Sequence, residues 1–462
     1  MVRTEMESVM KLNVCSQLFS RPAGSVGVAN CSSVALFGPG LVKPLRSILR
    51  ARARRLAVLG AALPLVTAAV FTAPSAVAAP VFGATPWTVV LCKYAGASAE
   101  PLTAADAVRR FVSPGVGGMA DYWRDASYGN IDISGGFVPS LHSSRAKNGW
   151  YDLADLGAGH AISDFQKLPN GARRAKLLND CRGAAGDDVK LEPWSHLLIV
   201  TNVNDGDTFG VAGPTIGGIT IAGATSVEPG SWNVDNFVGQ EMGHGYGLNH
   251  SWDTSPCEYC DEFDVMGNFR NGVGYKNVAL AAPQRFGLGW ISASRVFAPT
   301  PGIPTVQLAA LTQPTVAGFL MARIADSGDP SHFYTVEYRQ QQGWDSEIPG
   351  NGVVIHEVRS DGKIVFVPVK EASNRALTVS GETFMNAAGT VRVQLNCINP
   401  AAGTATVSFA IGSYGTCGSG ATSTPPAGSG GGSGGGGSAG GCGRNGCGLH
   451  PPGWHPSPIL FT

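Results

Sequence analysis

Charged side chains are scarce in this chain of 462 residues. They make up 14% of the sequence, and 33 basic residues balance 33 acidic ones, so the formal net charge is zero. Without an excess of positive charge, we expect no bulk electrostatic attraction to nucleic acid or to an anionic membrane surface. No Gly-x-Ser-x-Gly motif lies between a strand-like and a helix-like segment, where many hydrolases place a nucleophilic serine. A serine hydrolase of that kind is therefore unsupported.

Cysteine is also infrequent, with ten in the sequence, of which eight lie after residue 79. An even number of cysteines in an exported chain indicates disulfides, although the sequence leaves their connectivity open. Cys257 and Cys260 could be half of a zinc knuckle, but no second Cys-x-x-Cys pair exists. A local disulfide is the favoured interpretation of this pair, and a disulfide is also predicted for Cys92.

The N-terminal residues indicate export. A basic stretch at 50–55 precedes an apolar run at 56–71 and a small-residue segment at 76–79. This order is typical of a secretory signal peptide with its cleavage site, and a membrane anchor is the alternative. We therefore expect residues 1–79 to be an N-terminal extension and signal peptide. The remaining protein is predicted to be secreted, without stable membrane association.

Residues after position 79 are predicted to contain both helices and strands. Residues 87–94 and 197–202 are continuous apolar runs, which are typical of buried strands. Residues 103–122 show helical spacing that is interrupted at 113–115, and residues 210–223 alternate loosely, as in an edge hairpin. The sequence therefore predicts an α+β fold for a first domain at 80–296.

The pattern changes after residue 296. Short strand-like runs, separated by turn residues, occupy 305–311, 318–324, 333–339, 352–359, 363–369, 390–396 and 404–411. We expect a β-rich unit at 297–416. Residues 417–462 are rich in glycine and serine, which predicts a flexible linker and tail.

The segment from 240 to 250, QEMGHGYGLNH, carries the chemistry. Gln240 and His244 are four residues apart, so on a helix they lie on one face. Gly247 can end that helix in the left-handed conformation and turn the chain, which returns His250 to the same point. Three such ligands leave a fourth position open for water, as in a catalytic metal site. The alternative is a glycine-rich packing helix with incidental histidines.

Glu241 stands beside the first of these ligands. A bound metal would lower the pKa of its water and polarise a substrate carbonyl, and Glu241 would accept the proton of that water. Gln240 is a neutral oxygen ligand that binds zinc less strongly than an imidazole does. The site is therefore predicted to hold zinc weakly, or to accept another divalent transition metal such as copper.

These residues resemble the metzincin clan of zinc endopeptidases, and within it the gametolysin family, whose members carry Gln-Glu-x-x-His-x-x-Gly-x-x-His. The segment DVMG around Met266 looks like the Met-turn of that family. Residues 282–290 resemble its Leu-Gly-Trp element, and residues 333–356 resemble its strand, charged turn and strand. The resemblance covers roughly residues 87–360.

The resemblance implies a metzincin-like catalytic domain with a mixed sheet, an active-site helix and a Met-turn, followed by the β-rich unit. It makes Gln240, His244 and His250 the metal ligands, Glu241 the catalytic acid and base, and Met266 the structural Met-turn residue. The implied partner is a protein or peptide substrate. The alternative is a catalytically inert, metal-binding or adhesive extracellular protein that keeps the fold.

Three weaker signals remain open. Asn202, Asn204, Asp205 and Asp207 could bind calcium or form an Asx-rich turn. Asp253 could orient a metal ligand or cap a local turn. Tyr275 could stabilise an oxyanion or simply pack. In each case the second, structural interpretation is favoured.

Overall fold

The computed structural model describes residues 80–231, 235–267, 278–300, 302, 304–326, 328–371 and 373–412, without the side chains of Asp235 and Asn236. The predicted signal peptide, the linker and tail, and Tyr275 lie outside these residues.

The helices are α1 (Ala104–Ala107), which continues into a π-helix (Val108–Val112), α2 (Met119–Ala126), α3 (Ile162–Gln166), α4 (Asn170–Ala185), α5 (Asp235–Gly245) and α6 (Ala282–Gly287). The strands before α6 are β1 (Gly83–Ala84), β2 (Trp87–Lys93), β3 (Ile131–Asp132), β4 (Tyr151–Asp152), β5 (His196–Thr201), β6 (Phe209–Ala212), β7 (Thr215–Ile216), β8 (Ile219–Thr220), β9 (Gly223–Val227), β10 (Ser251–Asp253) and β11 (Cys257–Glu258). The later strands are β12 (Val296–Phe297), β13 (Thr305–Ala309), β14 (Met321–Asp326), β15 (Asp329–Arg339), β16 (Gly352–Val358), β17 (Ile364–Phe366), β18 (Thr383–Met385), β19 (Val391–Asn399) and β20 (Thr404–Ile411).

The N-terminal half is built on a five-stranded sheet in the order β4-β2-β5-β9-β6. Four strands are parallel, and β6 pairs antiparallel with β9 at one edge. Strands β2 and β5 are buried along their whole length, because a parallel sheet is covered on both faces. These strands confirm the predictions for 87–94 and 197–202.

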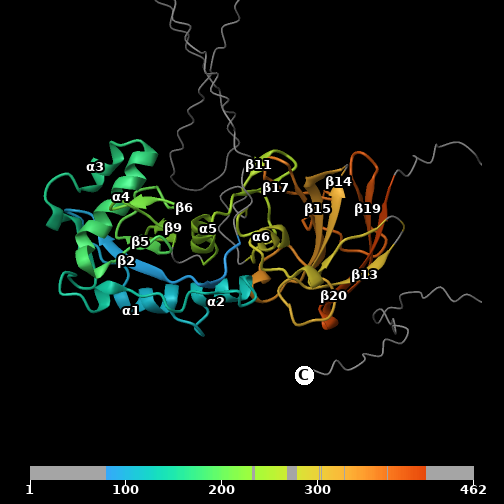
Figure 1. The fold of residues 1–462 in the computed structure, drawn as a ribbon, viewed down its shortest axis with the longest axis horizontal. Coiled ribbons are helices and arrows are strands. Elements are labelled where there is room, and N and C mark those ends of the chain that lie inside the picture. Colours follow the sequence, from blue (N-terminus) through green and yellow to red (C-terminus); the bar gives the residue numbers. More distant parts are fainter. Residues whose placement is uncertain are drawn as a thin grey trace, which may run out of the picture. The chain divides into compact units, whose positions relative to one another are not determined.

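Helices cover both faces of this sheet (Figure 1). Neighbouring residues of a strand point to opposite faces. Accordingly, Val89 and Leu91 pack in the apolar core that contains residues of α1, α2 and α5. Val90 and Cys92 pack in a second core, with α3 and α4. The observed α+β architecture agrees with the predicted fold class.

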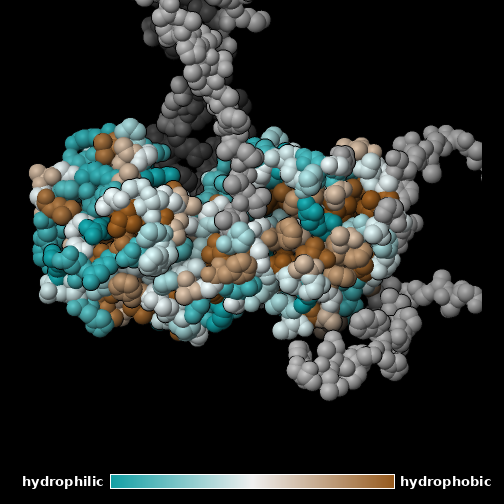
Figure 2. Space-filling model, in the orientation of Figure 1, coloured by the Kyte–Doolittle hydropathy of each residue, from teal (hydrophilic) through white to brown (hydrophobic). Residues whose placement is uncertain are grey.

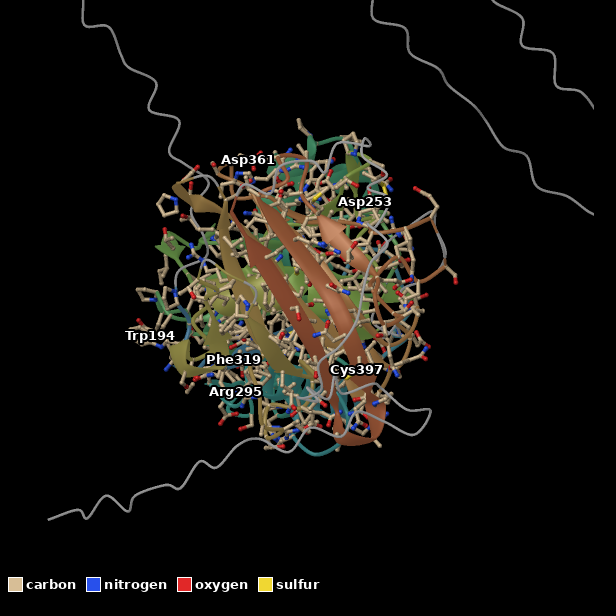
Figure 3. All side chains as sticks on the ribbon, turned by 90° about the vertical axis from the view of Figure 1, so that its right-hand side faces the viewer. Trp194, Asp253, Arg295, Phe319, Asp361 and Cys397 are labelled. Atoms are coloured by element: carbon tan, nitrogen blue, oxygen red, sulfur yellow. A yellow bond between two sulfur atoms is a disulfide. The ribbon has the colours of Figure 1, made fainter. Side chains whose placement is uncertain are left out.

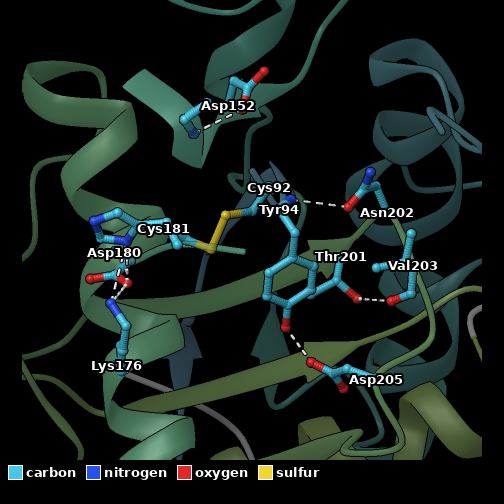
Figure 4. Close-up of a disulfide and its surroundings, with 12 residues drawn as sticks. Cys92, Tyr94, Asp152, Lys176, Asp180, Cys181, Thr201, Asn202, Val203 and Asp205 are labelled. Atoms are coloured by element: carbon cyan, nitrogen blue, oxygen red, sulfur yellow. Dashed lines mark hydrogen bonds and ion pairs between the residues drawn. A yellow bond between two sulfur atoms is a disulfide. The ribbon is translucent and has the colours of Figure 1, made fainter. Parts of the chain in front are cut away.

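A disulfide ties the sheet to a covering helix. Cys92 of β2 bonds to Cys181 of α4, and their Cα atoms are 5.7 Å apart (Figure 4). Cys257 also bonds to Cys260, so the local disulfide predicted for this pair is confirmed. The knuckle alternative is excluded, because a disulfide leaves no thiolate for a metal.

The C-terminal half consists of two sheets. The larger has the order β11-β10-β17-β16-β15-β14-β12, and the smaller has the order β13-β20-β19-β18. Their facing side chains form a third apolar core. Figure 3 views this half of the chain from outside, with Asp253 and Cys397 toward opposite ends of the strands. Each of the seven predicted strand-like runs contains or overlaps a strand, whereas β12 and β18 were not predicted.

One sheet includes strands from both sides of the predicted boundary at residue 296. Strand β10 follows His250 directly, and it pairs in parallel with β17 of the C-terminal half. The hairpin partner of β10 is β11. The residues that follow the histidine signature therefore extend a sheet made chiefly by the β-rich half.

The surface carries no large area of one character on the face drawn in Figure 2, where hydrophobic patches are most extensive over the β-rich half. No helix in the described part of the chain combines the length and the apolar composition that a bilayer crossing requires.

Candidate functional site

Helix α5 carries Gln240, Glu241 and His244. The first two side chains are buried, and His244 is half-buried. The helix ends close to the predicted stop, since Gly247 has φ +84° and its N–H donates to the carbonyl of His244 at 2.9 Å. The chain then reverses, which brings His250 back toward the helix.

The imidazole rings of His244 and His250 lie against each other, with centroids 4.6 Å apart and planes at 77°. Nδ1 of His244 lies 2.7 Å from the carbonyl oxygen of Leu248, and Nδ1 of His250 lies 2.6 Å from Oε1 of Glu258. A carbonyl and an ionised carboxylate only accept, so each ring donates through Nδ1–H. In a ring with this tautomer, Nε2 is the atom that carries the lone pair for a metal or another donor.

Burial sets the protonation of this site. It lowers the pKa of His244 to about 4, and the neighbouring His250 acts in the same direction. His244 is thus neutral at neutral pH, the state that a metal ligand requires. Burial raises the pKa of Glu241 to about 8, while Arg174 and a hydrogen bond from the Gly210 backbone oppose this rise. The desolvation of the carboxylate outweighs these two stabilising effects.

Glycines in and beside α5 permit unusually close packing. A Cβ added at Gly243 would lie 2.6 Å from Sδ of Met266, and one at Gly210 of β6 would overlap the carbonyl oxygen of Glu241. Glycine within a helix costs up to about 1 kcal/mol relative to alanine. Here that cost is offset by direct contact of the helix with β6 and with Met266.

Met266 is fully buried in a turn that is anchored by Asp264. The Asp264 carboxylate accepts hydrogen bonds from the hydroxyl of Ser251 and from the N–H groups of Met266 and Ala281, the latter two at 3.3 and 3.1 Å. Burial, with Asp261 nearby, raises the pKa of Asp264 to about 6. The turn is therefore fixed against both β10 and the start of α6.

A buried charge network supports the same segment. Arg339 of β15 pairs with Asp345 at 2.5 Å and with Glu337 at 3.0 Å, and all three side chains are fully buried. Glu337 accepts from the N–H of Ala282 at 2.5 Å, and Asp345 accepts from that of Ala279 at 2.8 Å. The three charged residues lie in the segment at 333–356 that the sequence indicated as a strand, charged turn and strand. Their contacts with the N–H groups of Ala279 and Ala282 were not predicted.

The side chain that orients His250 is not Asp253, which the sequence offered as a candidate. The hydrogen-bond partner of His250 is Glu258, which the sequence did not indicate. Its position between two cysteines was the one signal that could have drawn attention to it. Asp253 instead pairs with Arg375 at 2.7 Å and accepts from the N–H of Ser255, also at 2.7 Å. This favours the local structural role for Asp253.

In the segment rich in asparagine and aspartate after β5, the side-chain oxygens accept hydrogen bonds from groups of the protein itself. Asp207 pairs with Arg173 and Arg174 at 2.9 and 2.6 Å, and Asp205 accepts from the hydroxyl of Tyr94 (Figure 4). Asn204 accepts from the N–H of Gly206 in an Asx turn. These contacts favour the turn interpretation over calcium binding.

The three predicted ligands are of types that a transition metal accepts. Nitrogen atoms of His244 and His250 and the amide oxygen of Gln240 are ligands of the type that zinc and its neighbours accept. Among the described residues, no three His, Cys, Asp or Glu side chains gather as a metal site. A site made of two histidines and a glutamine contains only two residues of these four types, because Gln240 contributes an amide.

Comparison with known protein families supports a metallopeptidase. The sequence pattern of the family described as Gametolysin peptidase M11 matches residues 209–348, which include the whole histidine signature and the buried charge network. This match supports a gametolysin-like family member, as the resemblance predicted. The family implies a metal cofactor, typically zinc, and protein or peptide substrates. No curated protein matches the chain.

Proposed function

We propose that this protein is a secreted, zinc-type metalloendopeptidase. Gln240, His244 and His250 would hold the metal, Glu241 would be the general base, and Met266 would be the Met-turn residue beneath the site. The observation that carries the proposal is the pair of facing imidazoles whose Nδ1 atoms are both engaged, at 2.7 and 2.6 Å. When bound, the metal ion supplies a positive charge that lowers the pKa of water, polarises a carbonyl and favours ionised Glu241.

Glu241 is suited to moving a proton within a closed site. Its carboxylate accepts a hydrogen bond from the Gly210 N–H and is otherwise shielded from solvent. Once ionised, it can take a proton from water that attacks the peptide bond and return it to the leaving amine. The Leu248 and Glu258 acceptors hold the Nδ1 atoms of His244 and His250, which leaves their Nε2 atoms to face the metal.

Strand β6 offers a binding edge for an extended substrate. It is the last strand of the five-stranded sheet in the described residues. Its Gly210 donates a backbone hydrogen bond to the Glu241 carboxylate, and it has no room for a Cβ against the backbone of α5. An extended peptide can add to such an edge through backbone hydrogen bonds. A peptide bound there would pass beside Glu241, which supports cleavage within a chain rather than of a small ester.

Chelation and metal replacement test this function. We expect casein hydrolysis that is abolished by a chelator and restored by a stoichiometric amount of one divalent metal. A Gln240→His variant should bind zinc more tightly, because an imidazole replaces a neutral oxygen. Hydrolysis that is unaffected by complete metal removal would overturn the proposal.

The second candidate is an inert metal-binding or adhesive extracellular protein. It predicts stoichiometric metal binding without hydrolysis of any protein substrate. The buried Glu241 beside the ligand set favours the enzyme, because a protein that only binds metal has no use for an acidic side chain whose burial costs free energy.

A further inference from the structure

A small disulfide loop lies against His250. Strands β10 and β11 form a hairpin in which Trp252 pairs with Glu258, and the Cys257–Cys260 disulfide closes the turn immediately afterwards. Only Glu258 and Tyr259 stand between the two cysteines, and both contact His250.

The two contacts are of different kinds. Glu258 Oε1 lies 2.6 Å from Nδ1 of His250 and accepts a hydrogen bond from it. The ring of Tyr259 lies 4.1 Å from the His250 ring, measured between centroids, with the planes at 50°. The carboxylate fixes which nitrogen carries hydrogen, and the aromatic ring limits rotation of the imidazole.

The loop is held in this position from several sides. Tyr259 has φ +64°, a left-handed conformation that is unfavourable for a tyrosine and persists only where surrounding contacts impose it. Its N–H donates to the carbonyl of Ser251 at 3.3 Å. Arg375, from the β-rich half, donates to the carbonyl of Cys260 at 3.1 Å and pairs with Asp253 at 2.7 Å.

We infer that the Cys257–Cys260 loop is a positioning device for His250, in which Glu258 sets the tautomer and Tyr259 sets the ring orientation. This inference rests on the proposed function for its purpose, since an oriented Nε2 is what a metal site needs. Glu258 and Tyr259 act through His250 and are positioning residues. The disulfide matters because it presents both side chains from a loop of two residues.

The first test needs no metal. Nitrogen NMR shifts of the His250 ring in the metal-free protein report the tautomer directly. We expect the Nδ1–H form in the wild type and a shift toward the Nε2–H form in Glu258→Ala. Glu258→Gln retains an acceptor and should largely preserve the Nδ1–H form. An unchanged tautomer in Glu258→Ala would overturn the inference.

The second test measures zinc affinity by competition with a chromogenic chelator. Loss of a partner that orients a histidine ligand weakens metal binding by about 10–100-fold. We expect a loss in this range for Glu258→Ala and for the double change of Cys257 and Cys260 to serine. A smaller loss is expected for Tyr259→Ala. Glu371→Ala removes an exposed carboxylate elsewhere and should leave the affinity unchanged.

The outcomes separate this inference from the proposed function. If the wild type binds zinc and shows the affinity losses but hydrolyses no protein, the positioning role stands and the peptidase proposal fails. If the wild type is an active peptidase and Glu258→Ala keeps both tautomer and affinity, the peptidase stands and the positioning role fails. Thermal unfolding of each metal-free variant checks that the fold is retained.

Discussion

At the scale of single residues, the site depends on glycines, which have no Cβ, as much as on the proposed ligands. Gly243 lets Met266 reach the backbone of α5, whereas a Cβ at Gly239 on the same helix would meet Tyr122 at an ordinary 3.4 Å. We therefore expect Gly239→Ala to stabilise the protein by up to about 1 kcal/mol through helix propensity. Gly243→Ala should instead destabilise it by about 1–2 kcal/mol, because overpacking exceeds that gain.

Urea unfolding of both variants, compared with the wild type, measures this difference. Equal stabilisation by the two alanines would show that Met266 is not in close contact with the helix.

A second prediction at this scale concerns Glu382. Its carboxylate pairs with Lys370 at 2.7 Å and accepts from the N–H groups of Thr378 and Val379. Although burial acts in the opposite direction, these partners lower the pKa of Glu382 to about 2. A carboxyl with a lowered folded-state pKa stabilises the protein above its unfolded pKa, near 4.5, and loses that contribution as the pH falls toward 2.

Glu382→Gln should therefore cost on the order of 2 kcal/mol at pH 7 and progressively less between pH 4.5 and 2. Denaturant unfolding at several pH values provides the measurement. A cost that is independent of pH would show that the charge of Glu382 does not matter.

At the scale of elements, the sequence predicts what is local and misses what is distant. The spacing of Gln240, Glu241 and His244 follows from helical periodicity, and Gly247 marks the turn, so the arrangement on α5 could be read directly. Glu258 and Arg339 could not be assigned to the site. Their contacts depend on how β10, β11 and β15 pack in three dimensions, which periodicity does not encode.

The same scale gives a prediction about the charge network. Asp345→Ala would leave Arg339, which is fully buried, with one carboxylate partner fewer and free the N–H of Ala279. Removing one partner of a buried ion pair typically costs about 3–5 kcal/mol. Asp361→Ala, which removes an exposed carboxylate 4.0 Å from Lys363, should change stability by less than about 0.5 kcal/mol. Similar small effects of both changes in denaturant unfolding would contradict the supporting role of β15.

At the scale of the whole molecule, the two halves share structure at the site. The strand that follows His250 belongs to a sheet completed by β17, and Arg375 reaches the disulfide loop from the C-terminal half. The domains at 80–296 and 297–416 were predicted from a change in sequence pattern between them, and the sequence shows that change directly. Strand pairing between distant segments lies beyond that information.

We accordingly expect residues 80–296 alone to lack a cooperative unfolding transition, because β10 and the segment at 278–282 lose their partners. Residues 80–412 should unfold cooperatively. Calorimetry of the two chains is the comparison, and a stable, cooperative shorter chain would establish the catalytic part as an independent domain.

The central claim is that Glu241 performs proton transfer at a metal site on α5. The most direct test is kcat/KM for hydrolysis of a protein-derived peptide by the Glu241→Gln variant, with metal content measured in the same sample. Loss of a general base reduces the rate by about 10²–10⁴-fold, and we predict a loss in this range with one metal ion retained per chain. Wild-type kcat/KM in the metal-loaded Glu241→Gln protein would contradict the account.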